Sequence, residues 1–97
     1  MNKNFLITGA ANGIGLGYTR RALQSGGKVV LTDIDKEEGA RQVTQLGEEF
    51  GSGRVCFVHL DVRNEEMWRN AWDEAETFFD GPVEVKHLFV SIILNLP

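Results

Sequence analysis

Apolar residues gather in four short runs along the chain, and longer stretches of mixed polarity separate them. The runs are residues 5–7, 29–31, 55–60 and 88–94. Continuous runs rich in Val and Ile, rather than alternating ones, are typical of strands in a parallel sheet that is covered on both faces. The pattern therefore predicts four strands, the last of them near the end of the chain.

Each stretch between two runs predicts a helix. The first helix is expected over residues 14–25, before the stop signal Gly26-Gly27. The second is expected over residues 36–50, where apolar side chains recur every three or four positions, although Gly39 and Gly47 each weaken it by about 1 kcal/mol relative to alanine. The order of elements is then β-α-β-α-β-α-β, which indicates an α/β fold with a parallel sheet and right-handed crossovers.

The third helix has the clearest pattern. Asn64 can cap its start, and the two glutamates that follow suit the positive end of the helix dipole. Its apolar side chains form one stripe, which consists of Trp68, Trp72, Ala75 and Phe79. We interpret the two tryptophans as core residues rather than as a stacking surface for a ligand.

Composition narrows the class of protein. With 97 residues there is room for one small domain, and 42% hydrophobic and 25% charged residues are ordinary for a globular chain. The net charge of −4 and the scattered basic residues argue against a nucleic-acid partner. A single cysteine, Cys56, excludes an internal disulfide and fits a reducing compartment. No targeting segment, membrane span or metal-binding constellation is recognisable, so we expect a cytoplasmic protein without a metal or a membrane partner.

A glycine-rich turn, Thr8 to Gly15 with the sequence TGAANGIG, joins the first strand to the first helix. Gly9 lets the strand turn, Gly13 lets backbone approach a pyrophosphate, and Gly15 lets the helix pack closely on the strand. The helix offers unpaired N–H groups and a positive dipole end to phosphates. Asn12 could hold the turn through side-chain bonds to neighbouring backbone. Such turns also occur where no ligand binds.

An acidic residue follows the second strand, as dinucleotide binding requires. Asp33 lies 18 positions beyond Gly15. A carboxylate there accepts hydrogen bonds from the adenosine ribose hydroxyls and repels a 2′-phosphate, which favours NAD over NADP. Lys36 keeps NADP open as an alternative, and Asp33 could instead simply cap the next helix.

These motifs resemble the short-chain dehydrogenase/reductase family. The family's TGxxxGxG spacing is met by Thr8, Gly9, Gly13 and Gly15, and the strings LTDID, LGEEFG and RVCFVHLDV are most similar to its NAD-dependent 15-hydroxyprostaglandin dehydrogenase group. The resemblance covers residues 1 to about 85. It implies a partial Rossmann-like, doubly wound sheet, oxidation of a secondary alcohol, and full-length members that are homo-oligomeric.

The resemblance also implies a set of cofactor-binding residues. Gly9, Asn12, Gly13, Ile14 and Gly15 would line the pyrophosphate, Asp33 and Ile34 would flank the adenosine ribose, and Asp61 and Val62 would contact the adenine. A helix cap or a surface aspartate is the alternative interpretation of Asp61.

Beyond residue 85 the chain departs from the family. The expected Asn-Asn-Ala-Gly is missing, as are the Ser and the Tyr-x-x-x-Lys that carry out the family's proton chemistry. The only tyrosine is Tyr18, and no lysine follows it at that spacing. His59 is expected to be a packed or edge histidine, and His87 a loop residue. We therefore assign no catalytic residue.

The chain accordingly divides into an NAD-binding Rossmann half, residues 1–85, and a divergent tail, residues 86–97, with a candidate fourth strand. The strand order 3-2-1-4 would place two helices on one face, one on the other, and the fourth strand at an open edge. We hypothesise a truncated, catalytically incomplete dehydrogenase. The alternatives are a non-catalytic dinucleotide-binding or interaction fragment, and an unstable product without function.

Overall fold

The structure is a computed structural model that describes residues 3–88, and the side chains of residues 3–86. Seven elements follow one another along the chain: β1 (Asn4–Thr8), α1 (Gly13–Gln24), β2 (Lys28–Asp33), α2 (Lys36–Phe50), β3 (Val55–His59), α3 (Glu65–Phe79) and β4 (Val85–Leu88). The predicted order of strands and helices is confirmed, and α2 has the predicted bounds. The first helix begins and ends one residue earlier than predicted.

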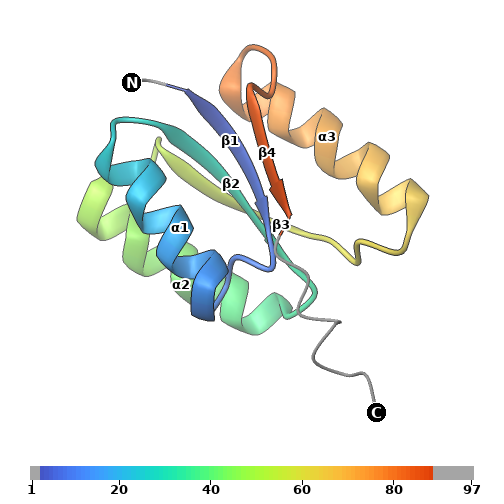
Figure 1. Ribbon diagram of the computed structural model, residues 1–97, viewed down its shortest axis with the longest axis horizontal. Coiled ribbons are helices and arrows are strands. Elements are labelled where there is room, and N and C mark those ends of the chain that lie inside the picture. Colours follow the sequence, from blue (N-terminus) through green and yellow to red (C-terminus); the bar gives the residue numbers. More distant parts are fainter. Residues whose placement is uncertain (1–2, 89–97) are drawn as a thin grey trace.

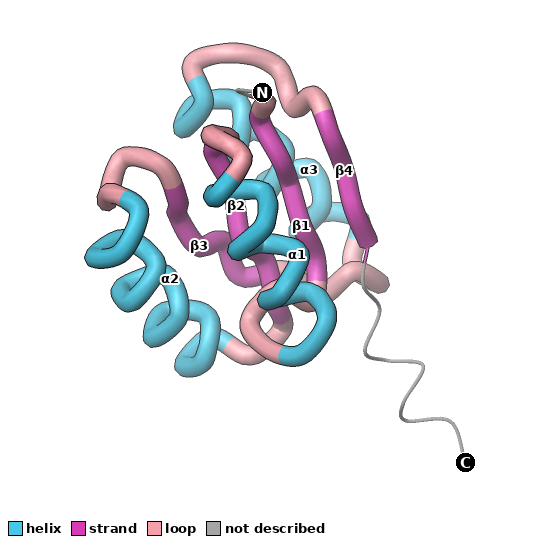
Figure 2. Tube along the Cα trace, turned by 60° about the vertical axis from the view of Figure 1, so that its left-hand side comes forward, coloured by secondary structure: helices cyan, strands magenta, loops and turns pink. Residues whose placement is uncertain are grey.

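The four strands form one parallel sheet in the order β3-β2-β1-β4. Helices α1 and α2 cover one face of the sheet and α3 covers the other, so the molecule has three layers (Figures 1 and 2). The predicted strand order and the predicted distribution of helices are therefore confirmed. Both β3 and β4 lie at edges of the sheet within the described residues.

Two apolar clusters hold the layers together, because successive side chains of a strand point to opposite faces. Ile7, Val29 and Leu31 are fully buried toward α1 and α2, whereas Leu6 and Val30 are fully buried toward α3. Burying one such side chain contributes roughly 1.5–3 kcal/mol. The continuous apolar runs in the sequence are thus explained by a sheet that is covered on both sides.

The edge strands differ from the predictions in two respects. The fourth strand begins at Val85, earlier than the predicted run 88–94, most of which lies outside the described residues. His87 lies in β4, opposite Ile7 of β1, and not in a loop. Cys56 is only partly buried because it lies on edge strand β3, although burial together with the nearby Glu74 raises the pKa of its thiol to about 12.

The stripe on α3 is confirmed as a packing surface, with one addition. Ala71, Ala75 and Phe79 are buried against the sheet, and the two tryptophans pack beside them half-buried. The Nζ atom of Lys86 on β4 lies 5.4 Å from the ring centre of Trp68 and 5.9 Å from that of Trp72. The ammonium group of Lys86 thus makes cation–π contacts with both indole rings of α3.

Candidate dinucleotide-binding site

The glycine-rich turn lies at the carboxyl end of β1, where all four parallel strands end on the same edge of the sheet (Figure 1). Gly9 and Gly13 both have φ +58°, a left-handed conformation that glycine adopts without strain. A Cβ atom at Gly13 would have no atom within 4 Å, so the turn is open on that side. The two glycines thus shape a turn that a ligand can approach closely.

Gly15 has a different role, as predicted. A Cβ atom there would lie 2.0 Å from the carbonyl oxygen of Gly9 and 2.8 Å from its carbonyl carbon. Backbone atoms cannot move aside as a flexible side chain can. Only glycine therefore lets the first turn of α1 lie directly against the turn that leaves β1.

The predicted side-chain bonds of Asn12 are absent from the described structure. Asn12 is the N-cap residue of α1, but its side chain accepts no cap hydrogen bond, and only its carbonyl oxygen accepts from the N–H of Leu16 at 3.2 Å. Strand β2 holds the turn instead. The N–H of Ala10 donates to the carbonyl of Thr32 at 3.0 Å, and the N–H of Ala11 donates to Oδ2 of Asp33 at 3.1 Å.

Asp33 therefore has a structural role that the sequence did not reveal. Asp33 is only 8% exposed, and its Oδ1 accepts from the N–H of Asp35 at 2.9 Å. The carboxylate joins the end of β2 to the glycine turn on one side and to the start of α2 on the other. Asp35, not Asp33, caps α2, since its side chain accepts from the N–H of Glu38.

The large apolar residues that flank this region are exposed. Ile14, in the first turn of α1, is 78% exposed, and Ile34, directly after Asp33, is 53% exposed. Isolated exposed apolar side chains are common at protein surfaces. These two, however, lie at the two points where the resemblance places the pyrophosphate and the ribose.

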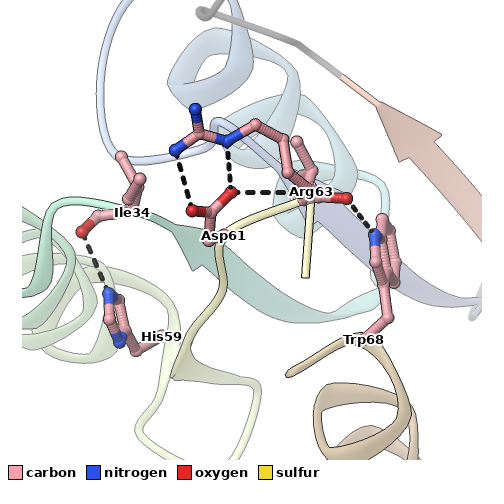
Figure 3. Close-up of polar contacts among 6 residues, drawn as sticks. Ile34, His59, Asp61, Arg63 and Trp68 are labelled. Carbon is pink, nitrogen blue, oxygen red and sulfur yellow. Dashed lines mark hydrogen bonds and ion pairs between the residues drawn. The ribbon is translucent and has the colours of Figure 1, made fainter. Parts of the chain in front are cut away.

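Asp61 follows β3 at the same edge of the sheet (Figure 3), and Val62 is the next residue in the chain. The N–H of Leu60 donates to the carbonyl of Asp33 at 3.1 Å, and the indole N–H of Trp68 donates to the carbonyl of Val62 at 2.8 Å. This segment is therefore fixed to β2 on one side and to α3 on the other. Trp68 therefore packs in the core and also holds the Val62 backbone. Its position in an apolar stripe did not indicate this second role.

Arg63 is a residue of this region that the sequence analysis missed. Its backbone N–H and its Nε atom both donate to Oδ1 of Asp61 at 3.0 Å, and its Nη2 atom donates to Oδ2 at 2.9 Å. These hydrogen bonds, together with the positive charge of Arg63, lower the pKa of the Asp61 carboxyl to about 2 and raise the pKa of the arginine. The only signal in the sequence was the spacing Asp-x-Arg.

His59 ends β3 beside these residues. Its Nε2 atom lies 3.1 Å from the carbonyl oxygen of Ile34, which can only accept, so Nε2 is the donor (Figure 3). The prediction of an edge histidine is confirmed. Tyr18 lies half-buried in the middle of α1 and meets the Phe5 ring edge-on, with 6.2 Å between ring centres. Phe5 is the second residue of β1, so this contact lies away from the glycine turn.

Within the described part of the chain, no group of three or more His, Cys, Asp or Glu residues could hold a metal ion. Over the same residues no helix is long and apolar enough to cross a membrane.

Comparisons with known proteins show which family the chain matches. The family described as short chain dehydrogenase matches residues 3–87. The 3-alpha-(or 20-beta)-hydroxysteroid dehydrogenase of Mycobacterium tuberculosis (strain ATCC 25618 / H37Rv) is 36% identical over 81 residues, which are 84% of this chain and 29% of that protein. The 15-hydroxyprostaglandin dehydrogenase [NAD(+)] of Rattus norvegicus is 34% identical over 74 residues, or 76% of this chain and 28% of that protein.

Solved structures show the same fold. A short chain dehydrogenase/reductase from Burkholderia phymatum in complex with NAD has a TM-score of 0.77 and 31% identity, over 84% of this chain and 28% of that one. L-sorbose reductase from Gluconobacter frateurii complexed with NADPH and L-sorbose has a TM-score of 0.75 and 28% identity, over 88% of this chain and 32% of that one. This chain thus spans about three tenths of the length of each of these four proteins. The parallel sheet, the glycine turn and the family match over residues 3–87 together place the chain in the short-chain dehydrogenase family.

Proposed function

We propose that this chain binds NAD along the edge of the sheet where β1, β2 and β3 end, as the dinucleotide-binding part of an oxidoreductase that oxidises a secondary alcohol. One observation carries the proposal. The open amino end of α1 lies next to a carboxylate, Asp33, that is hydrogen-bonded to the glycine turn itself. A phosphate site and a ribose site are thereby adjacent.

The pyrophosphate would lie against Gly9, Asn12, Gly13, Ile14 and Gly15. The first turn of α1 contains no acidic residue, and no side chain caps it. A helix amino end carries about half a unit of positive charge and N–H groups without partners inside the helix. An anionic group that reaches the open side of Gly13 would satisfy these donors.

The adenosine ribose would lie against Asp33 and Ile34. Each carboxylate oxygen of Asp33 accepts one backbone hydrogen bond in the structure. An ionised carboxylate offers about four acceptor positions, so each oxygen keeps one for a ribose hydroxyl. The same negative charge repels a 2′-phosphate, which supports NAD rather than NADP. Lys36, which is exposed at the start of α2, is the group that would favour NADP.

The adenine would lie against Asp61 and Val62, at the end of β3. The Asp61 side chain is 26% exposed, so a ligand can reach it from solvent. Its hydrogen bonds to Arg63 keep it ionised, and an ionised acceptor forms stronger hydrogen bonds than a neutral one.

When bound, NAD supplies the hydride acceptor for alcohol oxidation, and a nearby base must then take the alcohol proton. The strings LTDID, LGEEFG and RVCFVHLDV support a dehydrogenase similar to the 15-hydroxyprostaglandin group, and the substrate class that we propose is a secondary alcohol. The only tyrosine, Tyr18, packs on Phe5 and offers no such base at the binding edge. This packing favours a second candidate function, a dinucleotide-binding module that has no catalysis of its own.

Titration calorimetry with NAD and NADP tests the proposal. We expect the 97-residue chain to bind NAD about tenfold or more tightly than NADP, which corresponds to about 1.4 kcal/mol. Asp33→Ala should remove that preference, whereas Asp73→Ala, on the surface of α3, should not. Failure of the folded wild-type chain to bind either nucleotide would overturn the proposal. Formation of NADH from NAD and a secondary alcohol by this chain would overturn the module without catalysis.

A further inference from the structure

The Asp61 carboxylate is held by a single neighbour in an arrangement that leaves one acceptor free. Oδ1 accepts two hydrogen bonds from Arg63, one from the backbone N–H and one from Nε, whereas Oδ2 accepts only the bond from Nη2. A carboxylate oxygen has two lone pairs. Within the described structure Oδ1 is therefore saturated, and Oδ2 keeps one position for a donor from outside the chain.

The direction of this remaining acceptor is fixed by the surrounding backbone. The N–H of Asn64 donates to the carbonyl of Asp61 at 2.9 Å, so the turn between β3 and α3 is closed on itself. The planar fork of the guanidinium holds both carboxylate oxygens at once, which prevents rotation of the carboxylate (Figure 3). A free aspartate would sample several orientations, and this one is restricted to a single orientation.

Stability alone gives a weak reason for such a pair. The Arg63 side chain is 63% exposed, and exposed ion pairs typically contribute little to folding. The pair lies, however, on the same edge of the sheet as Ile34 and the carboxyl end of β2 (Figure 3). A residue that orients an acceptor at this edge can instead act on a ligand.

We infer that Arg63 is a positioning residue for the adenine base: it fixes the Asp61 carboxylate so that the remaining acceptor on Oδ2 receives the 6-amino group. This inference rests on the proposed function. Adenine carries a hydrogen-bond donor at position 6, whereas hypoxanthine carries an oxygen that only accepts. An oriented carboxylate favours the first base and repels the oxygen of the second, because two acceptors would face each other.

The affinities for NAD and for nicotinamide hypoxanthine dinucleotide, compared by calorimetry, test the inference. We expect the wild-type chain to prefer NAD about tenfold, since a hydrogen bond to a charged group contributes of that order. Arg63→Ala keeps the backbone N–H bond to Oδ1 but loses both guanidinium bonds, so Oδ2 is no longer held and the preference should fall to about threefold or less. Arg63→Lys keeps the charge without the planar fork, so its preference should lie between these values.

The matched control is Arg41→Ala, because Arg41 also pairs with a carboxylate, that of Glu38, but on helix α2. Its preference for NAD should equal that of the wild type. Titration of the Asp61 carboxyl by NMR gives a readout that needs no nucleotide. Its pKa should rise from about 2 toward the ordinary value of 3.8 in Arg63→Ala.

The outcomes separate this inference from the proposed function. If NAD binds and Asp33→Ala removes the preference for NAD over NADP, but folded Arg63→Ala prefers NAD over the hypoxanthine dinucleotide as strongly as the wild type, the inference alone is wrong. A stronger preference for NAD in that variant would mean that Arg63 obstructs the base, and would also overturn it. If the wild type binds neither dinucleotide, both proposals fail. Should Arg63→Ala not fold, an Arg63→Lys variant with wild-type preference would overturn the inference.

Discussion

The amino ends of α1 and α3 are similar in sequence, but their N-cap hydrogen bonds and first-turn charges differ. Each helix follows a parallel strand, and each begins after an asparagine, Asn12 or Asn64. Asn64 accepts from the N–H of Met67 at 3.0 Å, and two glutamates occupy the first turn of α3. Asn12 makes no cap bond, and the first turn of α1 has no acidic residue.

The difference shows that the chain itself caps the amino end of α3 and leaves the amino end of α1 without a side-chain cap. At α3 the side-chain cap and the negative charges satisfy the N–H groups and the dipole internally. At α1 the corresponding donors lie beside an open turn and an exposed isoleucine, Ile14. An asparagine occupies the N-cap position of both helices, but only Asn64 uses its side chain as a cap.

The largest expected effect tests the close packing of the α1 end. In Gly15→Ala the new Cβ would overlap the carbonyl oxygen of Gly9, so the helix must move away from β1. We expect the free energy of unfolding to fall by about 3 kcal/mol, at the upper end for overpacking. NAD binding should be lost with it. Chemical denaturation and calorimetry measure the two effects.

Gly17→Ala is the matched control for this substitution. It lies in the same helix, and a Cβ there would have no atom within 4 Å. Alanine should therefore stabilise the chain by about 0.5–1 kcal/mol through helix propensity and leave NAD binding unchanged. Equal effects of the two substitutions would contradict the structural role of Gly15.

A smaller effect is expected when the α1 end is made to resemble the α3 end. Ile14→Glu places a negative charge in the first turn, where the exposed side chain leaves room for it. The charge should stabilise the helix by about 0.3–1 kcal/mol. It should also weaken NAD binding about tenfold, because it repels the pyrophosphate. Ile14→Gln, which adds no charge, should change the affinity much less. Unchanged affinity in the glutamate variant would mean that no phosphate binds at this helix end.

The smallest effect distinguishes the two asparagines. Asn64→Ala removes a cap that the structure shows in use, and the free energy of unfolding should fall by about 1 kcal/mol. Asn12→Ala removes no side-chain cap bond, so its unfolding curve should match that of the wild type. A loss of similar size in both variants would show that the two helix ends are not different after all.

Local patterns predicted the fold well because they are set by interactions within each element. The apolar runs marked the strands, and the spacing around Asn64 marked the start of α3, since helix caps act on residues three positions away. Gly39 shows the limit. Helix propensity makes it a weakness of α2, but a Cβ there would lie 2.0 Å from the ring of Phe57 on β3. The contact partner is 18 residues away, and no helical pattern reveals it.

The candidate site divides in the same way. The glycine spacing and the position of Asp33 after β2 were readable from the sequence, because turn geometry and strand ends restrict the types of residue allowed there. The sequence did not reveal that Asp33 holds the turn through the N–H of Ala11, or that the Asn12 side chain makes no such bond. Both depend on which backbone N–H comes to face which side chain once β1 and β2 pair.

By itself, the sequence determined the order of the elements, the glycine-rich turn between β1 and α1, and the acidic residue beside it. These are local choices of residue, each constrained by backbone geometry or by burial along a strand. Only the tertiary structure decided which helix end stays open, which carboxylate is tied to the turn, and how Arg63 orients Asp61. Those outcomes depend on distances between residues of different strands, turns and helices, and they are fixed when the parallel strands align.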